Sequence, residues 1–162
     1  MLPRIVTIGV YGFDQESFFA ALLNARLDIF CDIRQRRGMR GSIYAFANSA
    51  RLQRRLQELG IRYMHVKELA PAEAVREQQV QEDQKLHIVK RTRTMLSENF
   101  IRAYEDSCLT TFDSQQFLQK VGPDANVIGL FCVEREPEAC HRSLAAKKLA
   151  QDLGCSIEHI RP

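Results

Sequence analysis

A thiol, an imidazole, a guanidinium and a hydroxyl follow one another at Cys140, His141, Arg142 and Ser143. They follow the most apolar run of the chain and belong to an expected helix, which Pro137 can begin. The first turn of a helix has unpaired backbone N–H groups and the positive end of the helix dipole, which favour an anion or a thiolate. We therefore expect Arg142 and the helix terminus to hold a phosphate or carboxylate, with Ser143 donating a hydrogen bond.

The same segment suggests a nucleophilic thiol, because a helix N-terminus and a neighbouring cation lower the pKa of a cysteine such as Cys140. Adjacent helical residues point about 100° apart, however, so their order in the sequence does not by itself pair Cys140 with His141. Cys132, Cys140 and His141 lack the ligand spacing of zinc motifs, and no metal site is predicted. If the protein is an enzyme, Asp32 or Glu134 would be its acid/base residue and Cys140 or His141 its reactive group.

Two arginines have both a ligand-binding and a structural interpretation. Asp32 and Arg34 end an expected strand, and side-chain alternation directs both to the same face of the sheet. They either bind a ligand together or pair with each other, and we favour the ligand for Arg34. Arg142 can likewise bind an anion or pair with Glu134 or Glu138.

The loop after Arg34 carries an excess of positive charge. Seven arginines and no carboxylate lie in the range 33–57, in a chain with 23 basic and 20 acidic side chains. Together with the aromatic Tyr44 and Phe46 that follow, Arg36, Arg37 and Arg40 therefore indicate contacts with phosphate groups and bases. The alternative is a solvated loop. Tyr11, which follows the first expected strand, is a further ligand-binding candidate.

Fewer indications come from the first and third expected strands. His65 and Glu68 follow the third strand and can form an acid/base pair, although a single histidine at a strand end is more often structural. We include His65 among the ligand-binding candidates. Gly9 and Gly12 follow the first strand without completing a GxGxxG pattern, so no nicotinamide cofactor is predicted and the cofactor stays unknown.

The elements that must position these residues alternate between strand and helix. Strands are expected over 4–10, 27–33, 61–66, 127–133 and 156–160, and helices after an Asp14 cap and over 48–59, 85–104, 111–121 and 137–153. Residues 68–84 include a polar stretch that is either a solvated helix or a variable insertion. This order predicts a three-layer, doubly wound, Rossmann-like fold: a mainly parallel five-stranded sheet with helices on both faces. Ligands of such folds bind beyond the carboxyl ends of the strands.

Size and composition are those of one α/β domain over residues 1–162, with 45% hydrophobic and 27% charged residues. The five scattered cysteines form no CxxC pair, which favours free thiols over a disulfide framework. No apolar run is long enough for a signal peptide or a membrane span. We therefore expect a cytoplasmic protein without a membrane partner.

Taken in chain order, these motifs resemble a bacterial and archaeal family called domain of unknown function 488 (DUF488). The matching pieces are Thr7–Gly9 with Gly12, Cys31–Arg34, Gly60–His65, Glu68–Leu69, Glu134 and Pro137–Ser143. The resemblance implies an α/β domain of unassigned activity, whose motif residues gather at one end of the sheet.

Three functions stay open from the sequence. The leading hypothesis is a protein that binds a phosphorylated small molecule, a nucleotide or a nucleic acid through Arg34, the 36–40 loop and Arg142. The second is a thiol-dependent enzyme with Cys140 as its nucleophile. The third is a non-catalytic interaction module whose basic face docks on a partner.

Overall fold

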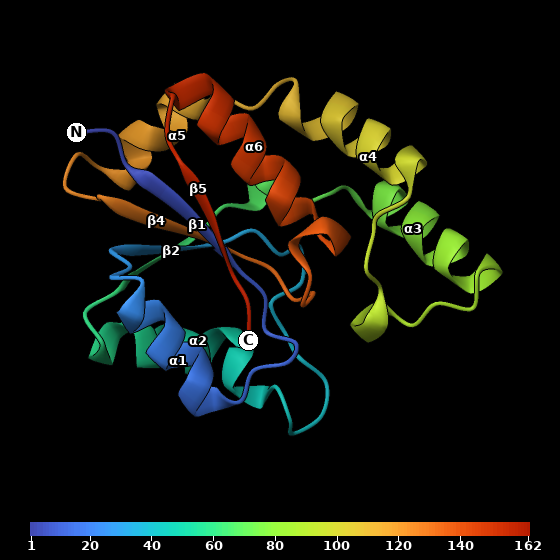
Figure 1. The fold of residues 1–162 in the computed structure, drawn as a ribbon, viewed down its shortest axis with the longest axis horizontal. Helices are drawn as coiled ribbons and strands as arrows, with labels where there is room; N and C mark the ends of the chain where they lie inside the picture. Colours follow the sequence, from blue (N-terminus) through green and yellow to red (C-terminus); the bar gives the residue numbers. More distant parts are fainter.

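Five strands form the centre of the computed structural model, which describes residues 1–162 (Figure 1). They are β1 (Arg4–Ile8), β2 (Ile29–Asp32), β3 (Arg62–His65), β4 (Val127–Phe131) and β5 (Ile157–Ile160). Their spatial order is β3-β2-β4-β1-β5, and every pairing between neighbours is parallel. The expected five-stranded α/β sheet is thus confirmed, and it is parallel throughout.

Helices cover both faces of the sheet (Figure 1). Helices α1 (Gln15–Asn24) and α2 (Ser49–Glu58) lie on one face, and α5 (Ser114–Val121) and α6 (His141–Leu153) lie on the other. The neighbouring strands β2 and β4 therefore lead into helices on opposite faces, which is where doubly wound folds form a ligand-binding crevice. None of the helices combines the length and the apolar character that crossing a lipid bilayer requires.

Helices α3 (Glu73–Lys85) and α4 (Glu98–Tyr104) pack against each other to one side of the sheet and form an arm (Figure 1). The helical alternative for the polar stretch after 68 is thus the observed one. The helix predicted over 85–104 is wrong in its first half, because His87 has a left-handed φ of 54° that ends α3. The chain then runs through a loop with one short 3-10 turn, Lys90–Thr92, until the Ser97 side chain caps α4.

The helix predicted from Pro137 also begins later than expected. Pro137–Ala139 is a separate 3-10 turn, and the extended backbone of Cys140 (φ −136°, ψ 144°) interrupts the helix before α6 starts at His141. Cys140 is therefore the N-cap residue of α6, and His141 and Arg142 occupy its first turn. At the other end, Gly154 stops α6 in the left-handed conformation (φ 70°), as its position predicts.

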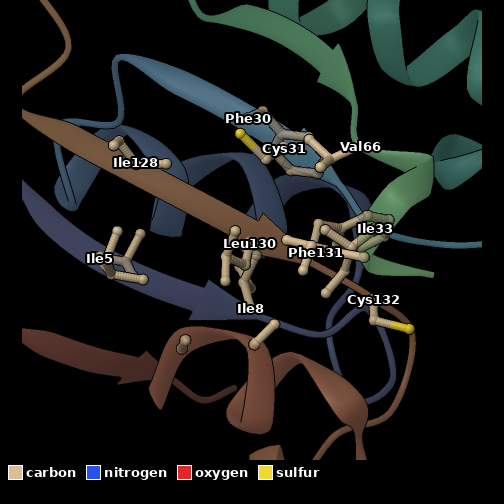
Figure 2. Close-up of a cluster of buried hydrophobic side chains, with 14 of the residues drawn as sticks. Ile5, Ile8, Phe30, Cys31, Ile33, Val66, Ile128, Leu130, Phe131 and Cys132 are labelled. Atoms are coloured by element: carbon tan, nitrogen blue, oxygen red, sulfur yellow. The ribbon is translucent and has the colours of Figure 1, made fainter. Parts of the chain in front are cut away.

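The three inner strands β1, β2 and β4 carry the apolar core (Figure 2). Ile5, Ile8, Phe30, Leu130 and Phe131 are fully buried there, whereas β3 and β5 at the sheet edges are partly exposed. Because the inner strands are covered on both faces, they read as continuous apolar runs in the sequence. The polar residues that follow the carboxyl ends of these strands, such as Asp32, Arg34 and Glu134, are consequently buried.

Candidate functional site

A cavity of about 500 Å³ lies at the carboxyl ends of β2 and β4. Its wall comes from the turn at Tyr11, the 34–40 loop, residues 71–100, which include α3 and the loop to α4, and the segment from Cys132 to His141. This is the switch point of the sheet, and the volume is within the range of small-ligand sites. The cavity is therefore the candidate functional site.

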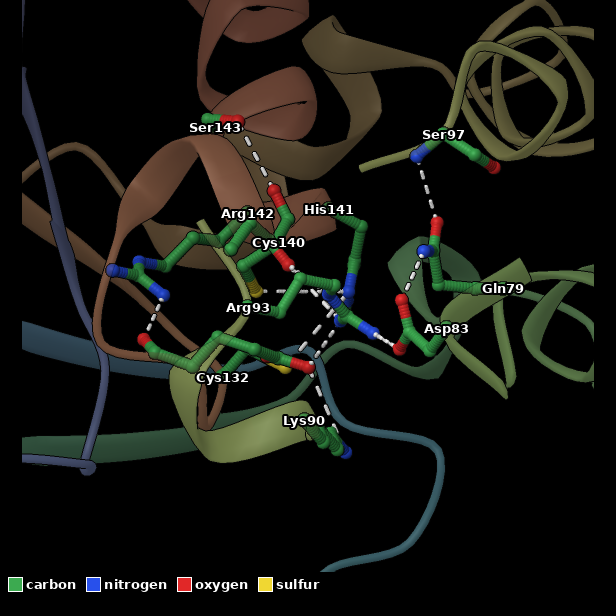
Figure 3. A network of polar contacts seen from close by, with 12 residues as sticks. Gln79, Asp83, Lys90, Arg93, Ser97, Cys132, Cys140, His141, Arg142 and Ser143 are labelled. Atoms are coloured by element: carbon green, nitrogen blue, oxygen red, sulfur yellow. Dashed lines mark hydrogen bonds and ion pairs between the residues drawn. The ribbon is translucent and has the colours of Figure 1, made fainter. Parts of the chain in front are cut away.

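Two thiols and an imidazole, those of Cys132, Cys140 and His141, lie close together beside this cavity (Figure 3). The Nδ1 atom of His141 lies 3.8 Å from the sulfur of Cys132 and 3.9 Å from that of Cys140. The other ring nitrogen, Nε2, lies 3.0 Å from the carbonyl oxygen of Ile33. Because a carbonyl only accepts, Nε2 must carry a proton, and Nδ1 therefore faces the sulfurs. Cys132 and His141 line the cavity, whereas Cys140 is only 1% exposed and does not.

The surroundings of the two thiols move their pKa values in opposite directions. Burial raises the pKa of Cys140, but a hydrogen bond with Cys132 and the positive charges of His141 and Arg142 outweigh it and hold that pKa well below its ordinary value. The hydrogen bond with Cys140, together with burial, raises the pKa of Cys132. Burial lowers the pKa of His141, but the negative charge of Cys140, the contact with its sulfur and the charge of Glu134 together raise that pKa above its ordinary value. Both shifts favour a thiolate at Cys140 beside a protonated His141.

Glu134 borders the same cavity, and its carboxylate contacts two cations of the loop between α3 and α4. Its Oε1 accepts a hydrogen bond from Arg93 at 3.0 Å and lies 3.6 Å from Nζ of Lys90, while its Oε2 is buried without any hydrogen-bond partner. Burial raises the pKa of this carboxyl group. Arg93 is also paired with Asp83 at 2.7 Å and donates to the carbonyl oxygen of Ala139 (Figure 3).

Arg142 has neither of the two roles that the sequence left open. Its guanidinium is fully buried and donates to the backbone oxygens of Glu134 and Arg135, not to a carboxylate and not into the cavity. The hydroxyl of Ser143 donates to the carbonyl oxygen of Cys140 at 3.0 Å. Both expectations of ligand binding at this helix terminus are therefore corrected, because the donors are already used to fix the connection between β4 and α6.

Asp32 and Arg34 pair with each other, which was the structural alternative. Both oxygens of Asp32 accept from the Arg34 guanidinium, at 2.9 and 2.7 Å, and a third Arg34 nitrogen donates to the carbonyl oxygen of Ala47. Tyr63 donates to Asp32 at 2.8 Å, and Arg37 donates to the Tyr63 hydroxyl at 3.2 Å. Arg34 borders the cavity with its donors occupied, whereas Asp32 and Arg37 do not line it.

His65 belongs to another part of the molecule than the candidate site. Its Nε2 lies 2.9 Å from the carbonyl oxygen of Arg34, and its side chain lines a second cavity together with Glu68 and Cys108. The expected acid/base pair of His65 and Glu68 thus shares a cavity, but a separate one. The ligand-binding role expected for His65 is not located at the switch point.

Seven arginine and lysine side chains line the cavity at the switch point. Besides Arg34 and Arg93, they are Arg36, Arg40, Arg76, Lys90 and Arg91. Arg40 and Arg91 form no ion pair, and the Arg91 guanidinium lies over the rings of Tyr11 and Tyr44 at 5.5 and 5.4 Å. The Nε atom of Arg76 is buried without a hydrogen-bond partner. Arg36, which is exposed, is 3.6 Å from Glu73. Of the expected ligand-binding residues, Tyr11, Arg34, Arg36 and Arg40 thus meet at the cavity.

Sequence reasoning missed the contribution of the arm. Gln79 and Asp83 lie on the buried side of α3, at the spacing where an amphipathic helix would carry apolar residues. Their partners are distant in the chain, since Asp83 pairs with Arg93 and Arg93 with Glu134. The only local signal was the i, i+4 placement of Gln79 and Asp83, which are hydrogen-bonded at 2.8 Å.

Comparison with known proteins connects the chain with one family. The family described as "Domain of unknown function DUF488" matches residues 14–149, a range that contains every residue lining the cavity except Tyr11. No curated protein and no solved structure matches the chain.

Proposed function

The chain thus belongs to the DUF488 family, whose description assigns no activity, and we propose that its cavity binds a phosphorylated small molecule of nucleotide size. One observation carries this proposal: Arg40, Arg76 and Arg91 line the cavity, and none of these three side chains forms an ion pair. A guanidinium group that is partly removed from water without an acceptor costs free energy, which a bound acceptor would recover. An anion is the acceptor that such a group favours.

The charge balance of the cavity supports an anionic ligand. Its two carboxylates, Asp83 and Glu134, both accept from Arg93, so they neutralise that side chain before any other. The cations Arg40, Arg76 and Arg91 have no carboxylate of their own in the cavity wall. Guanidinium groups bind phosphate oxygens in pairs, and they do so more strongly inside a cavity than at an open surface.

A small molecule fits this site better than a nucleic acid. Of the seven arginines in the range 33–57, Arg51, Arg54 and Arg55 lie on α2 and do not line the cavity. A nucleic acid would need a continuous positive surface, whereas the cations discussed here surround a cavity of about 500 Å³. Tyr11 lies in the same wall, where the guanidinium of Arg91 lies over its ring at 5.5 Å.

The other two hypotheses have less support. For a thiol-dependent enzyme, the favourable observation is the 3.9 Å approach of the Cys140 sulfur to Nδ1 of His141. The same sulfur is buried behind the cavity wall, where a substrate does not reach it without rearrangement. For a docking module, the arginines of the 33–57 range would have to share a face, and they are divided between α2, the Asp32 pair and the cavity.

Calorimetric titration with a panel of phosphorylated ligands tests the proposal. The panel contains pyrophosphate, a nucleoside diphosphate and a short oligonucleotide, and the proteins are the wild type, an Arg76→Gln/Arg91→Gln variant and an Arg51→Gln/Arg54→Gln control. We expect the first two ligands to bind the wild type and the control alike. Binding to the cavity variant should be at least about tenfold weaker, equivalent to about 1.4 kcal/mol.

Two results would contradict this function. Absence of binding by the wild type to any phosphorylated ligand would remove the anion site. Strong binding of the oligonucleotide alone, weakened in the Arg51→Gln/Arg54→Gln control, would instead indicate a nucleic-acid surface that includes α2.

A further inference from the structure

We propose that Cys132, Cys140 and His141 form a binding site for a divalent transition-metal ion, with zinc as the best match to two sulfurs and one nitrogen. The three potential ligand atoms lie within 4.8 Å of one another, and all three residues are buried. This proposed metal site is separate from the arginines of the anion site and does not depend on them. It stands on the geometry of the three side chains and of the segments that hold them.

The two nitrogen–sulfur distances are close to those of a tetrahedral metal site. Bonds of about 2.3 Å from zinc to sulfur and about 2.0 Å to nitrogen place sulfur and nitrogen roughly 3.5 Å apart, and two sulfurs roughly 3.8 Å apart. The observed separations between Nδ1 of His141 and the two sulfurs, 3.8 and 3.9 Å, exceed the first value by only a few tenths of an ångström. Small side-chain shifts therefore suffice to bind the ion.

The imidazole is oriented as in a metal ligand. Its Nε2 proton is directed to the carbonyl oxygen of Ile33 at 3.0 Å, so Nδ1 is the nitrogen available to the ion. Histidine ligands in metal sites usually have such an outer hydrogen bond, which fixes the ring and its tautomer. Zinc binds cysteine as the thiolate and histidine through an unprotonated nitrogen, so metal binding would release to solvent the protons held by the two sulfurs and Nδ1.

The backbone that carries the two cysteines is fixed from both sides. Arg142 donates to the carbonyl oxygens of Glu134 and Arg135, just after Cys132, and Arg93 donates to that of Ala139, just before Cys140. The site is thus assembled by buried hydrogen bonds in the protein as it stands. A pre-organised ligand set of this kind is what selective metal binding needs.

The charges of the neighbourhood are compatible with a cation. Two thiolates neutralise a divalent ion, so the occupied site adds no net charge beside Arg93 and Arg142. Arg93 is balanced by Asp83 and Glu134, and Arg142 is surrounded by backbone oxygens.

Cys132 and His141 line the cavity, so an ion held by the three side chains would lie next to it. Three protein ligands with one open position are the arrangement in which zinc binds water or a substrate oxygen. Glu134 borders the same cavity, and one of its carboxylate oxygens is buried without a hydrogen-bond partner.

Cobalt titration of the full-length, reduced and metal-free protein tests the site. We expect one equivalent of Co²⁺ to produce sulfur-to-cobalt charge-transfer absorption and the visible bands of four-coordinate cobalt, both removed by zinc. Replacement Cys132→Ser should weaken binding by more than about 100-fold, since loss of an outer-shell partner alone costs about 10–100-fold. Cys155→Ser is the matched control, because Cys155 lies outside the cluster and should leave the titration unchanged.

A second measurement uses only the wild type, in case the Cys132→Ser variant does not fold. X-ray absorption of the zinc-loaded protein should show two sulfur ligands at about 2.3 Å and at least one nitrogen. A first shell of oxygen and nitrogen alone, or cobalt spectra without thiolate absorption, would overturn the proposal. Isolation of metal-free protein with a disulfide between Cys132 and Cys140 that forms in preference to metal binding would overturn it as well. Pyrophosphate titration of the metal-free protein tests the anion site separately.

Discussion

Two sets of arginines lie at the same end of the sheet, and their guanidinium groups have opposite surroundings. Arg34, Arg93 and Arg142 are buried, and their donors are taken by carboxylates and backbone oxygens. Arg40 and Arg91 are exposed at the cavity and form no ion pair. The density of arginines therefore does not locate a ligand site by itself. What separates a structural arginine from a ligand-binding one is whether the fold already supplies its acceptors.

We expect the largest loss of stability when the carboxylate partner of a buried guanidinium group is removed. Asp32→Ala leaves Arg34 buried without its carboxylate, and we expect a loss of about 3–5 kcal/mol in the free energy of unfolding. Urea denaturation monitored by circular dichroism measures it. The control is Glu58→Ala, which removes the partner of the exposed Arg55 and should cost no more than about 1 kcal/mol. Equal losses in the two variants would mean that burial does not distinguish these pairs.

A buried arginine that donates mainly to backbone oxygens should have the next largest effect. Arg142→Met leaves the carbonyl oxygens of Glu134 and Arg135 without their donor, and we expect a loss of about 3 kcal/mol in the free energy of unfolding. The exposed neighbour Arg135 provides the control, since Arg135→Met should stay within about 0.5 kcal/mol of the wild type. A wild-type denaturation midpoint for Arg142→Met would show that these hydrogen bonds do not hold the segment.

A third substitution, at Gly9 beside Arg142, should have a smaller effect on stability. A Cβ atom added at Gly9 would lie 1.8 Å from the carbonyl oxygen of Glu134 and 2.9 Å from the Arg142 guanidinium, so the backbone must move. Gly9→Ala should therefore destabilise the fold by about 1–3 kcal/mol in the same denaturation assay. Gly38→Ala, whose added atom would meet only Asn48 at 3.7 Å, should have a far smaller effect. Similar midpoints for both variants would contradict the close approach at Gly9.

The smallest expected effect is on the pKa of His159, which senses the charges of the buried Arg142 and the exposed Arg161. Burial lowers the pKa of His159, and the positive charges of Arg142 and Arg161 lower it further. Because the folded pKa lies below the unfolded value, the unfolded chain binds more protons, and stability is lost as the pH falls from about 6.5 towards the folded pKa. Salt screens the exposed Arg161 but hardly the buried Arg142, so the NMR-measured pKa should rise only slightly at high ionic strength. A return to the ordinary histidine pKa would show that exposed charges alone cause the shift.

The fold was largely predictable because its strongest signals are local. The apolar runs that became β2 and β4, the Asp14 cap and Gly154 each act through residues close in sequence. The strand order was not predicted, since pairing of β4 between β2 and β1 depends on contacts roughly a hundred residues apart.

The candidate site was predictable only in part. Strand ends indicated Arg34, Arg36, Arg40 and the segment from Glu134 to His141, because parallel strands direct their carboxyl ends to one edge. The role of Arg142 and the contribution of Arg93 depend on backbone oxygens and carboxylates that only the folded chain brings near. The helical spacing around Val89 was also misleading, because this exposed residue belongs to the loop that carries Arg93.

The most direct test of the account measures the free energy of unfolding with and without pyrophosphate, in the wild type and in the Arg76→Gln/Arg91→Gln variant. At about 100 times its dissociation constant, the ligand should stabilise the wild type by about 2.7 kcal/mol. The variant should unfold within about 0.5 kcal/mol of the wild type without ligand and gain much less from the same concentration. If pyrophosphate stabilises both proteins equally, or neither, the cavity cations do not form the anion site.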